Sequence, residues 1–219
     1  MKLAAIHTSK VSALAEIAEF IPTGKVFAPD LMTAIGERCE FRKVPQDFGK
    51  KDAAPAVFEI GKWNDQPINK LTIFNDGIVL ETSSDTDDTD ATLQQLLLWA
   101  KKEIGINYKP EMIRRKLFTS QLVVYSDMEL DSVHPILKEL ATFVSSDVSK
   151  QFDQQLVYRT AGITIGPNTL TSKFPPTAFS IERRIDVPDS NNKYFSTAPL
   201  RTTDHMALLE RLEKSLGRK

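Results

Sequence analysis

The sequence predicts an α+β fold in which a mostly antiparallel sheet carries helices packed on one face. Two observations predict this class. Segments rich in β-branched and aromatic residues come in pairs joined by short turns, and Leu-rich helical patterns follow these pairs in blocks. Parallel sheets need a regular alternation of strand and helix, so the block order favours antiparallel pairing.

The beginning of the chain carries two weak helical patterns. Val11, Leu14, Ala15 and Ala18 recur at helical spacing and predict a helix over residues 9–20. A second helix is predicted over residues 29–39. Proline suits its first turn, because the N–H that proline lacks would have no partner there.

Strand patterns occupy much of the remaining chain. They cover residues 56–63, 71–74, 78–82, 117–125, 156–165 (one strand, or two joined at Gly162), 178–187 and 193–197. Asn75-Asp76-Gly77 predicts a hairpin, since Gly accepts the positive φ that a type I′ turn requires. Residues 188–192 are all turn formers and predict a second hairpin.

Three stronger helical patterns cover residues 90–104, 131–144 and 204–216. The first has Thr89 or Asp90 as its N-cap and ends at Gly105. The second places five apolar residues on one face, namely Val133, Ile136, Leu137, Leu140 and Val144.

The first and third of these helices follow predicted hairpins, begin near an aspartate and end at glycine. The chain is therefore one α+β domain over residues 1–219, or one built from two similar hairpin-helix halves, 1–108 and 109–219. Hairpin followed by helix is a common succession, so both interpretations stay open. The arrangement resembles saddle-like folds made of two sheet-plus-helix halves, a likeness that implies no function.

The composition excludes several classes of protein. The chain is 41% hydrophobic and 26% charged, with a net charge of −1, which excludes a disordered chain and a strongly basic nucleic-acid coat. Cys39 is the only cysteine, so an intrachain disulfide and a Cys-rich zinc site are excluded. A lone thiol and the lack of a signal peptide or a membrane-length apolar run predict a cytoplasmic protein with no membrane span.

Familiar catalytic motifs are missing from the sequence, including phosphate loops, zinc-protease motifs and nucleophile elbows. We therefore expect no catalytic residue, no cofactor and no metal. The four aspartates of residues 85–90 do not fit a calcium loop, because Asp90 and Leu96 stand where Gly and Glu are needed. They predict a solvated loop before a helix, with metal binding as the alternative.

Four basic residues are the candidates for binding an anionic group or a partner. Arg114, Arg115 and Lys116 end a locally basic stretch, and Arg183 shares a strand face with Phe179 and Ile181. An arginine on an apolar face needs a carboxylate or an anion as its partner. The alternative is a structural role for all four. His134 and His205 are expected to be packing residues, with acid–base chemistry as the alternative.

The sequence thus predicts a non-catalytic soluble protein that acts through protein–protein interaction or self-association, with a protein partner or a homodimer. The alternative is a nucleic-acid or phosphate-handling enzyme that uses the acidic tract with Arg114, Arg115 or Arg183. It is less favoured because the chain has no excess positive charge and no recognisable catalytic motif.

Overall fold

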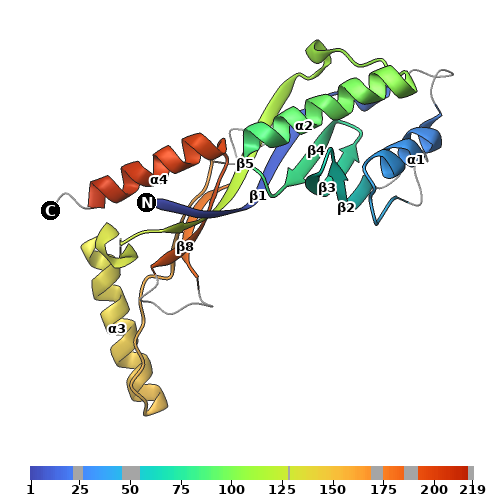
Figure 1. Cartoon of the computed structure of the whole chain (residues 1–219). Coiled ribbons are helices and arrows are strands. Elements are labelled where there is room, and N and C mark those ends of the chain that lie inside the picture. Colours follow the sequence, from blue (N-terminus) through green and yellow to red (C-terminus); the bar gives the residue numbers. More distant parts are fainter. Residues whose placement is uncertain (22–26, 46–54, 128, 169–174, 185–191, 217–219) are drawn as a thin grey trace. The chain divides into compact units, whose positions relative to one another are not determined.

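The computed structural model describes residues 1–21, 27–45, 55–127, 129–168, 175–184 and 192–216. Its strands form one eight-stranded antiparallel sheet in the order β2-β3-β4-β1-β5-β8-β7-β6, and four α-helices accompany them (Figure 1). The predicted α+β class is therefore confirmed. Within the described residues, no helix has the length and apolar character needed to cross a membrane.

The backbone divides into two compact units. Unit 1 comprises Met1–Ala5, Gln121–Pro199 and Thr203–Lys219, and unit 2 comprises Ile6–Ser120 and Leu200–Thr202. Strands β1 (Lys2–Leu14) and β5 (Arg115–Tyr125) pass from one unit into the other. Each unit contains a hairpin followed by a helix, and two similar halves remain a prediction.

The helix predicted over residues 9–20 is wrong, because β1 occupies residues 9–14 and only a short 3₁₀ turn, Ile17–Glu19, follows. β1 pairs with β4 (Gly77–Thr82) from Ser9 opposite Thr82 to Leu14 opposite Gly77. Val11 and Ala13 are buried, whereas Ser12 between them faces the other side of the sheet. Over so short a stretch the apolar residues fit either spacing, and the pairing with β4 decides between them.

β2 (Ala56–Trp63), β3 (Gln66–Phe74) and β4 form a meander. The hairpin predicted around Gly77 is confirmed. The reason for the glycine differs from the predicted one, because Gly77 has no positive φ. A Cβ atom at Gly77 would lie 2.7 Å from the carbonyl oxygen of Ala13, so the close approach of β1 requires glycine there. The loop between β2 and β3 has the positive φ angles, 46° at Asn64 and 67° at Asp65.

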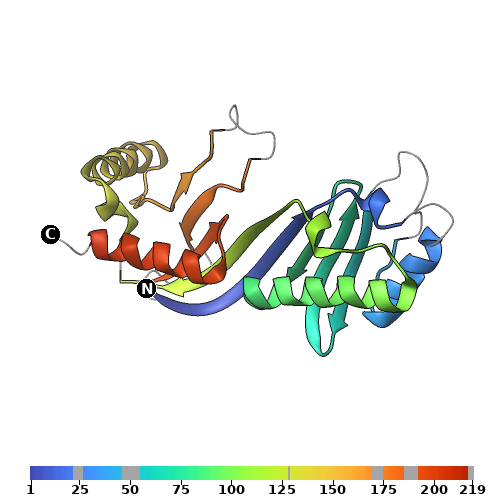
Figure 2. The same ribbon diagram turned by 90° about the horizontal axis from the view of Figure 1, so that it is seen from above.

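Helices α1 (Ala28–Arg38) and α2 (Thr86–Trp99) pack against these strands and enclose the core of unit 2 (Figure 2). α2 begins four residues earlier than the pattern predicts. Its N-cap is Asp85, whose Oδ1 accepts hydrogen bonds from the backbone N–H groups of Asp87 (2.9 Å) and Asp88 (2.8 Å). A single π-helical turn, Ala100–Ile104, follows, and Gly105 ends it with a φ of 85°.

Unit 1 contains strands β6 (Gly162–Ile165), β7 (Phe179–Arg183) and β8 (Lys193–Ala198). Helix α4 (Thr202–Leu216) follows β8. Helix α3 (Pro135–Phe152) begins later than predicted, because Pro135 takes its first position after the N-cap His134, and it ends eight residues later than predicted. Residues 188–191 of the predicted turn lie outside the described residues.

Candidate functional site

The predicted basic residues of unit 2 lie at the start of β5. Lys116 forms an ion pair with Asp90 of α2, with 2.5 Å between Nζ and Oδ1, and both side chains are largely shielded from solvent. Arg115 is exposed, and the backbone N–H of Arg114 donates to the carbonyl oxygen of Leu14. The acidic residues 85–90 and the basic residues 114–116 therefore meet, but they do so through an internal ion pair.

Arg201 belongs to the same cluster, although the sequence pattern did not indicate it. It pairs with Asp87 and lies 4.0 Å from Asp90, and its guanidinium stacks 3.9 Å from the ring centre of Phe118. Next to it, Thr202 and Thr86 each donate a backbone N–H to the hydroxyl of the other, at 2.9 and 3.1 Å. These contacts fasten residues 200–202 to the first turn of α2, which is a structural role.

Arg183 lies in unit 1, on β7, so it belongs to a different unit from Arg114, Arg115 and Lys116. It is half-buried, donates to the hydroxyl of Tyr194 at 3.2 Å and lies over that ring. Burial favours a higher pKa for nearby Asp131, but hydrogen bonds from Thr160 together with Arg159 and Arg183 outweigh burial and lower it. The guanidinium thus has an aromatic and an acidic neighbour within its own unit.

His205 is fully buried in unit 1. Its Nε2 lies 2.9 Å from Ser196 Oγ, and that hydroxyl donates to the carbonyl oxygen of Ser180 at 2.7 Å. The rings of His205 and Phe179 meet edge to face, and burial lowers the pKa of His205 to about 4. The imidazole is therefore neutral near pH 7 and belongs to the core.

Cys39 and clusters of possible metal ligands are two further candidates for a reactive site. Burial raises the pKa of the Cys39 thiol to about 12, so this core cysteine is not a reactive thiolate. Within the described ranges, no three or more His, Cys, Asp or Glu side chains form a group that could hold a metal ion.

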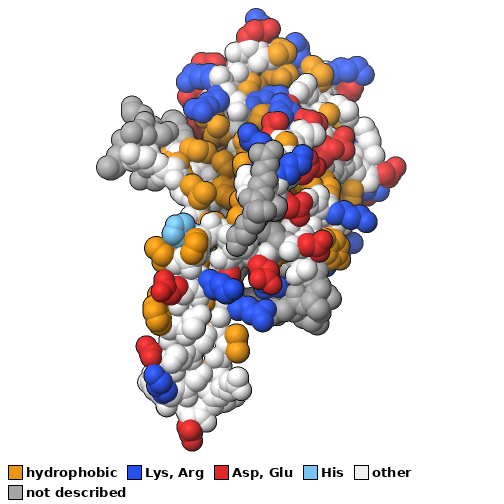
Figure 3. Space-filling view, turned by 90° about the vertical axis from the view of Figure 1, so that its left-hand side faces the viewer, with side chains coloured by type: hydrophobic (Ala, Val, Ile, Leu, Met, Phe, Trp, Pro, Cys, Tyr) orange, Lys and Arg blue, Asp and Glu red, His pale blue; other side chains and the backbone are white. Residues whose placement is uncertain are grey.

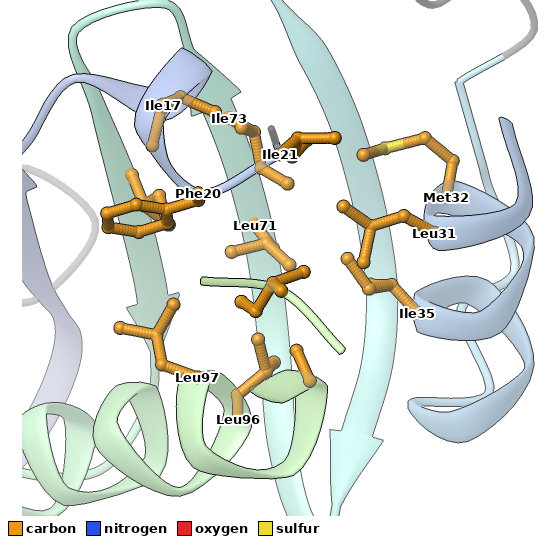
Figure 4. Close-up of a pocket in the computed structure, with 13 residues that line it drawn as sticks. Ile17, Phe20, Ile21, Leu31, Met32, Ile35, Leu71, Ile73, Leu96 and Leu97 are labelled. Atoms are coloured by element: carbon orange, nitrogen blue, oxygen red, sulfur yellow. The ribbon is translucent and has the colours of Figure 1, made fainter. Parts of the chain in front are cut away.

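An apolar cavity of about 30 Å³ lies in unit 2 between α1, α2 and the strands (Figure 4). Leu31 and Ile35 of α1 face Leu71, Ile73 and Leu96 across it. Pockets that hold small organic ligands are roughly 300–1,000 Å³, so this space is a gap in core packing.

α3 packs on one side only. The chain returns along its inner side, beside the yellow helix of Figure 1. There Ser145 Oγ accepts a hydrogen bond from the backbone N–H of Tyr158 (2.8 Å), and Ser149 Oγ accepts one from that of Leu156 (2.9 Å). Asp131 Oδ1 accepts another from Thr160 (2.8 Å). No residue of α3 is buried, and the outer side of the helix is exposed to solvent.

The outer side of α3 carries an apolar stripe, defined as Ile136, Leu140 and Phe143. These residues stand at positions i, i+4 and i+7 of one helical face and are 60%, 54% and 59% exposed. The sequence pattern groups Leu137 and Val144 with Ile136 and Leu140. In the structure Leu137 and Val144 are half-buried on the inner side. The single face predicted for this helix is therefore divided between the returning chain and the solvent.

An acidic groove of about 540 Å³ lies beside the stripe at the beginning of α3. Its lining residues are Glu129, Asp131, Ser132, Pro135, Lys138, Glu139 and Thr142. On a helix of 3.6 residues per turn, Glu139 projects between the groove and the stripe. Figure 3 shows this part of unit 1 as the lower projection, with hydrophobic and acidic side chains next to one another along its edge.

No protein-family model matches the chain, and no curated protein matches it. The function is therefore inferred from the surfaces of the chain itself. Among those described above, the stripe on α3 has large apolar side chains that no other part of the described chain covers.

Proposed function

We propose that the chain is a non-catalytic protein that acts by binding another protein chain through the apolar stripe of α3. The observation that supports this proposal is the exposure of Ile136, Leu140 and Phe143, each more than half accessible on one helical face. Single exposed apolar residues are ordinary, whereas a contiguous row of large ones marks an interaction surface.

Burial of the stripe would supply part of the binding energy of a complex, and contacts around it would supply the rest. Fully burying one such side chain stabilises a complex by about 1.5–3 kcal/mol, so covering the exposed parts of three contributes about 3 kcal/mol. A helix that lays an apolar face against a partner at positions i, i+4 and i+7 is a recurring recognition mode. The lone reduced cysteine supports the cytoplasm as the location of this interaction.

The alternative, a nucleic-acid or phosphate-handling enzyme, has weaker support. It requires the acidic tract and the basic residues to face a substrate together. Lys116 with Asp90, and Arg201 with Asp87, instead neutralise one another at the beginning of α2. We therefore retain the binding role as the proposal.

The test compares three variants of the full chain, Leu140→Ser, Phe143→Ser and the control Leu98→Ser. Leu98 is 54% exposed on α2, so it matches Leu140 in size, exposure and helical setting. Affinity purification from the native host and light scattering measure the partner or the dimer, and circular dichroism checks folding.

We expect the wild type and Leu98→Ser to retain the same partner or dimer, and the two α3 variants to lose it at least tenfold. A wild-type chain that is monomeric and captures nothing would contradict the proposal. Equal loss in Leu98→Ser would contradict it as well.

A further inference from the structure

The surroundings of the apolar stripe are strongly acidic. Residues 127–153 contain six aspartates and glutamates and two lysines, a net charge of −4 in a chain whose total is −1. Glu139 projects beside Leu140, and Glu129 and Asp131 line the groove next to it. The groove lining has three carboxylates and one cation, Lys138, so its net charge is negative. Asp131 is already engaged with Thr160, so Glu129 and Glu139 are the groove carboxylates that we expect a partner to meet.

This charge distribution disfavours a second copy of the chain as the occupant of the stripe. In a two-fold dimer the same patch meets itself, so residues near its centre face their own counterparts. The stripe is centred on Leu140, and such a pairing brings Glu139 close to Glu139 of the other copy. Like charges in an interface cost binding energy and act against that partner.

From this juxtaposition of an apolar stripe with an acidic groove we infer that the partner is a different protein, which presents an amphipathic segment with lysines or arginines beside its apolar face. The inference rests on the proposed function and specifies the partner. The apolar side chains of the segment cover Ile136, Leu140 and Phe143, and a long basic side chain enters the groove between Glu129 and Glu139. The groove has a volume of about 540 Å³, which accommodates a lysine or arginine side chain.

The test uses a synthetic helical peptide in which leucines form one face and lysines the other. A matched peptide has glutamate at every lysine position. Binding of each labelled peptide to the full chain is measured by fluorescence anisotropy at low and at high salt. The protein variants are Leu140→Ser and Glu139→Lys, with Glu37→Lys as the control, because Glu37 is an exposed acid on α1 of unit 2.

We expect the Leu/Lys peptide to bind, with weaker binding at high salt, and the Leu/Glu peptide not to bind. Leu140→Ser and Glu139→Lys should each weaken binding of the Leu/Lys peptide at least fivefold, and Glu37→Lys should leave it within twofold. Equal binding of both peptides, or equal effects of Glu139→Lys and Glu37→Lys, would overturn the inference.

Light scattering separates the failure of this inference from the failure of the proposed function. A dimer that Leu140→Ser dissociates and Glu139→Lys preserves would overturn the basic partner and leave the proposed function supported. If Leu140→Ser leaves the binding of the peptide, of a host protein and of a second copy unchanged, the inference and the proposed function are both wrong.

Discussion

Acidification from pH 7 to pH 5 should destabilise the chain through His205. The imidazole is fully buried with a pKa of about 4, whereas the same group in the unfolded chain has its ordinary value of 6.5. Between these values the unfolded chain binds a proton that the folded chain excludes, so stability decreases as the pH falls. This loss of stability is small above about pH 6.5 and grows progressively as the pH falls toward 4.

The magnitude follows from these two pKa values. Linkage gives a loss of about 2 kcal/mol between pH 7 and pH 5 for this single group. Glu213 also titrates. Burial favours a higher pKa for its carboxylate, but the N-terminal ammonium and Ser126, which donate hydrogen bonds to it, outweigh burial and lower the pKa. Its contribution is therefore lost only at lower pH, in the usual carboxyl range and below it.

The assay is urea unfolding followed by circular dichroism at pH 7, 6 and 5 and constant ionic strength. The variant His205→Gln does not titrate and keeps an N–H donor for Ser196. We expect it to be less stable than the wild type at pH 7, and its free energy of unfolding to change much less between pH 7 and pH 5. Parallel losses in the wild type and the variant would refute the assignment of this pH dependence to His205.

Three further stability predictions concern unit 2 and are measured by the same urea unfolding at pH 7. Asp85→Ala removes the N-cap of α2 and should cost about 1 kcal/mol, whereas Asp85→Asn should cost much less; equal costs would show that the cap is not the cause. Leu31→Ala enlarges the apolar cavity and should cost about 3 kcal/mol or more, and a loss below about 1 kcal/mol would contradict its place in the core. Asp90→Ala and Lys116→Ala should be non-additive by about 1 kcal/mol in a double-mutant cycle, and strict additivity would rule out the ion pair.

Local signals predicted much of the fold correctly. The strand over residues 56–63 follows from side-chain type, and the helix ending at Gly105 follows from its leucine spacing. The hairpin at Gly77 is where the turn residues predict it, although the close approach of β1, and not a positive φ, requires the glycine. The helix predicted over residues 9–20 failed because its apolar residues fit two periods, and only the pairing of β1 with β4 selected the strand.

The candidate surface depended more on tertiary structure. The apolar spacing predicts a helix that carries Ile136, Leu137, Leu140 and Val144, but periodicity does not show which apolar residues find a neighbour. The chain returning from residue 154 contacts the inner side of α3 and leaves Ile136 and Leu140 exposed. Arg201 lies far along the chain from Asp87, so no local pattern could have joined them.

The sequence by itself determined the α+β class, most of the elements and the absence of familiar catalytic motifs, because these depend on residue type and short-range spacing. Only the tertiary structure decided which charges are paired and which apolar residues remain exposed, because both depend on contacts between segments far apart in the chain. The candidate basic residue Lys116 thereby became part of an internal ion pair. A helix face expected to pack on a core became the surface on which the proposed function rests.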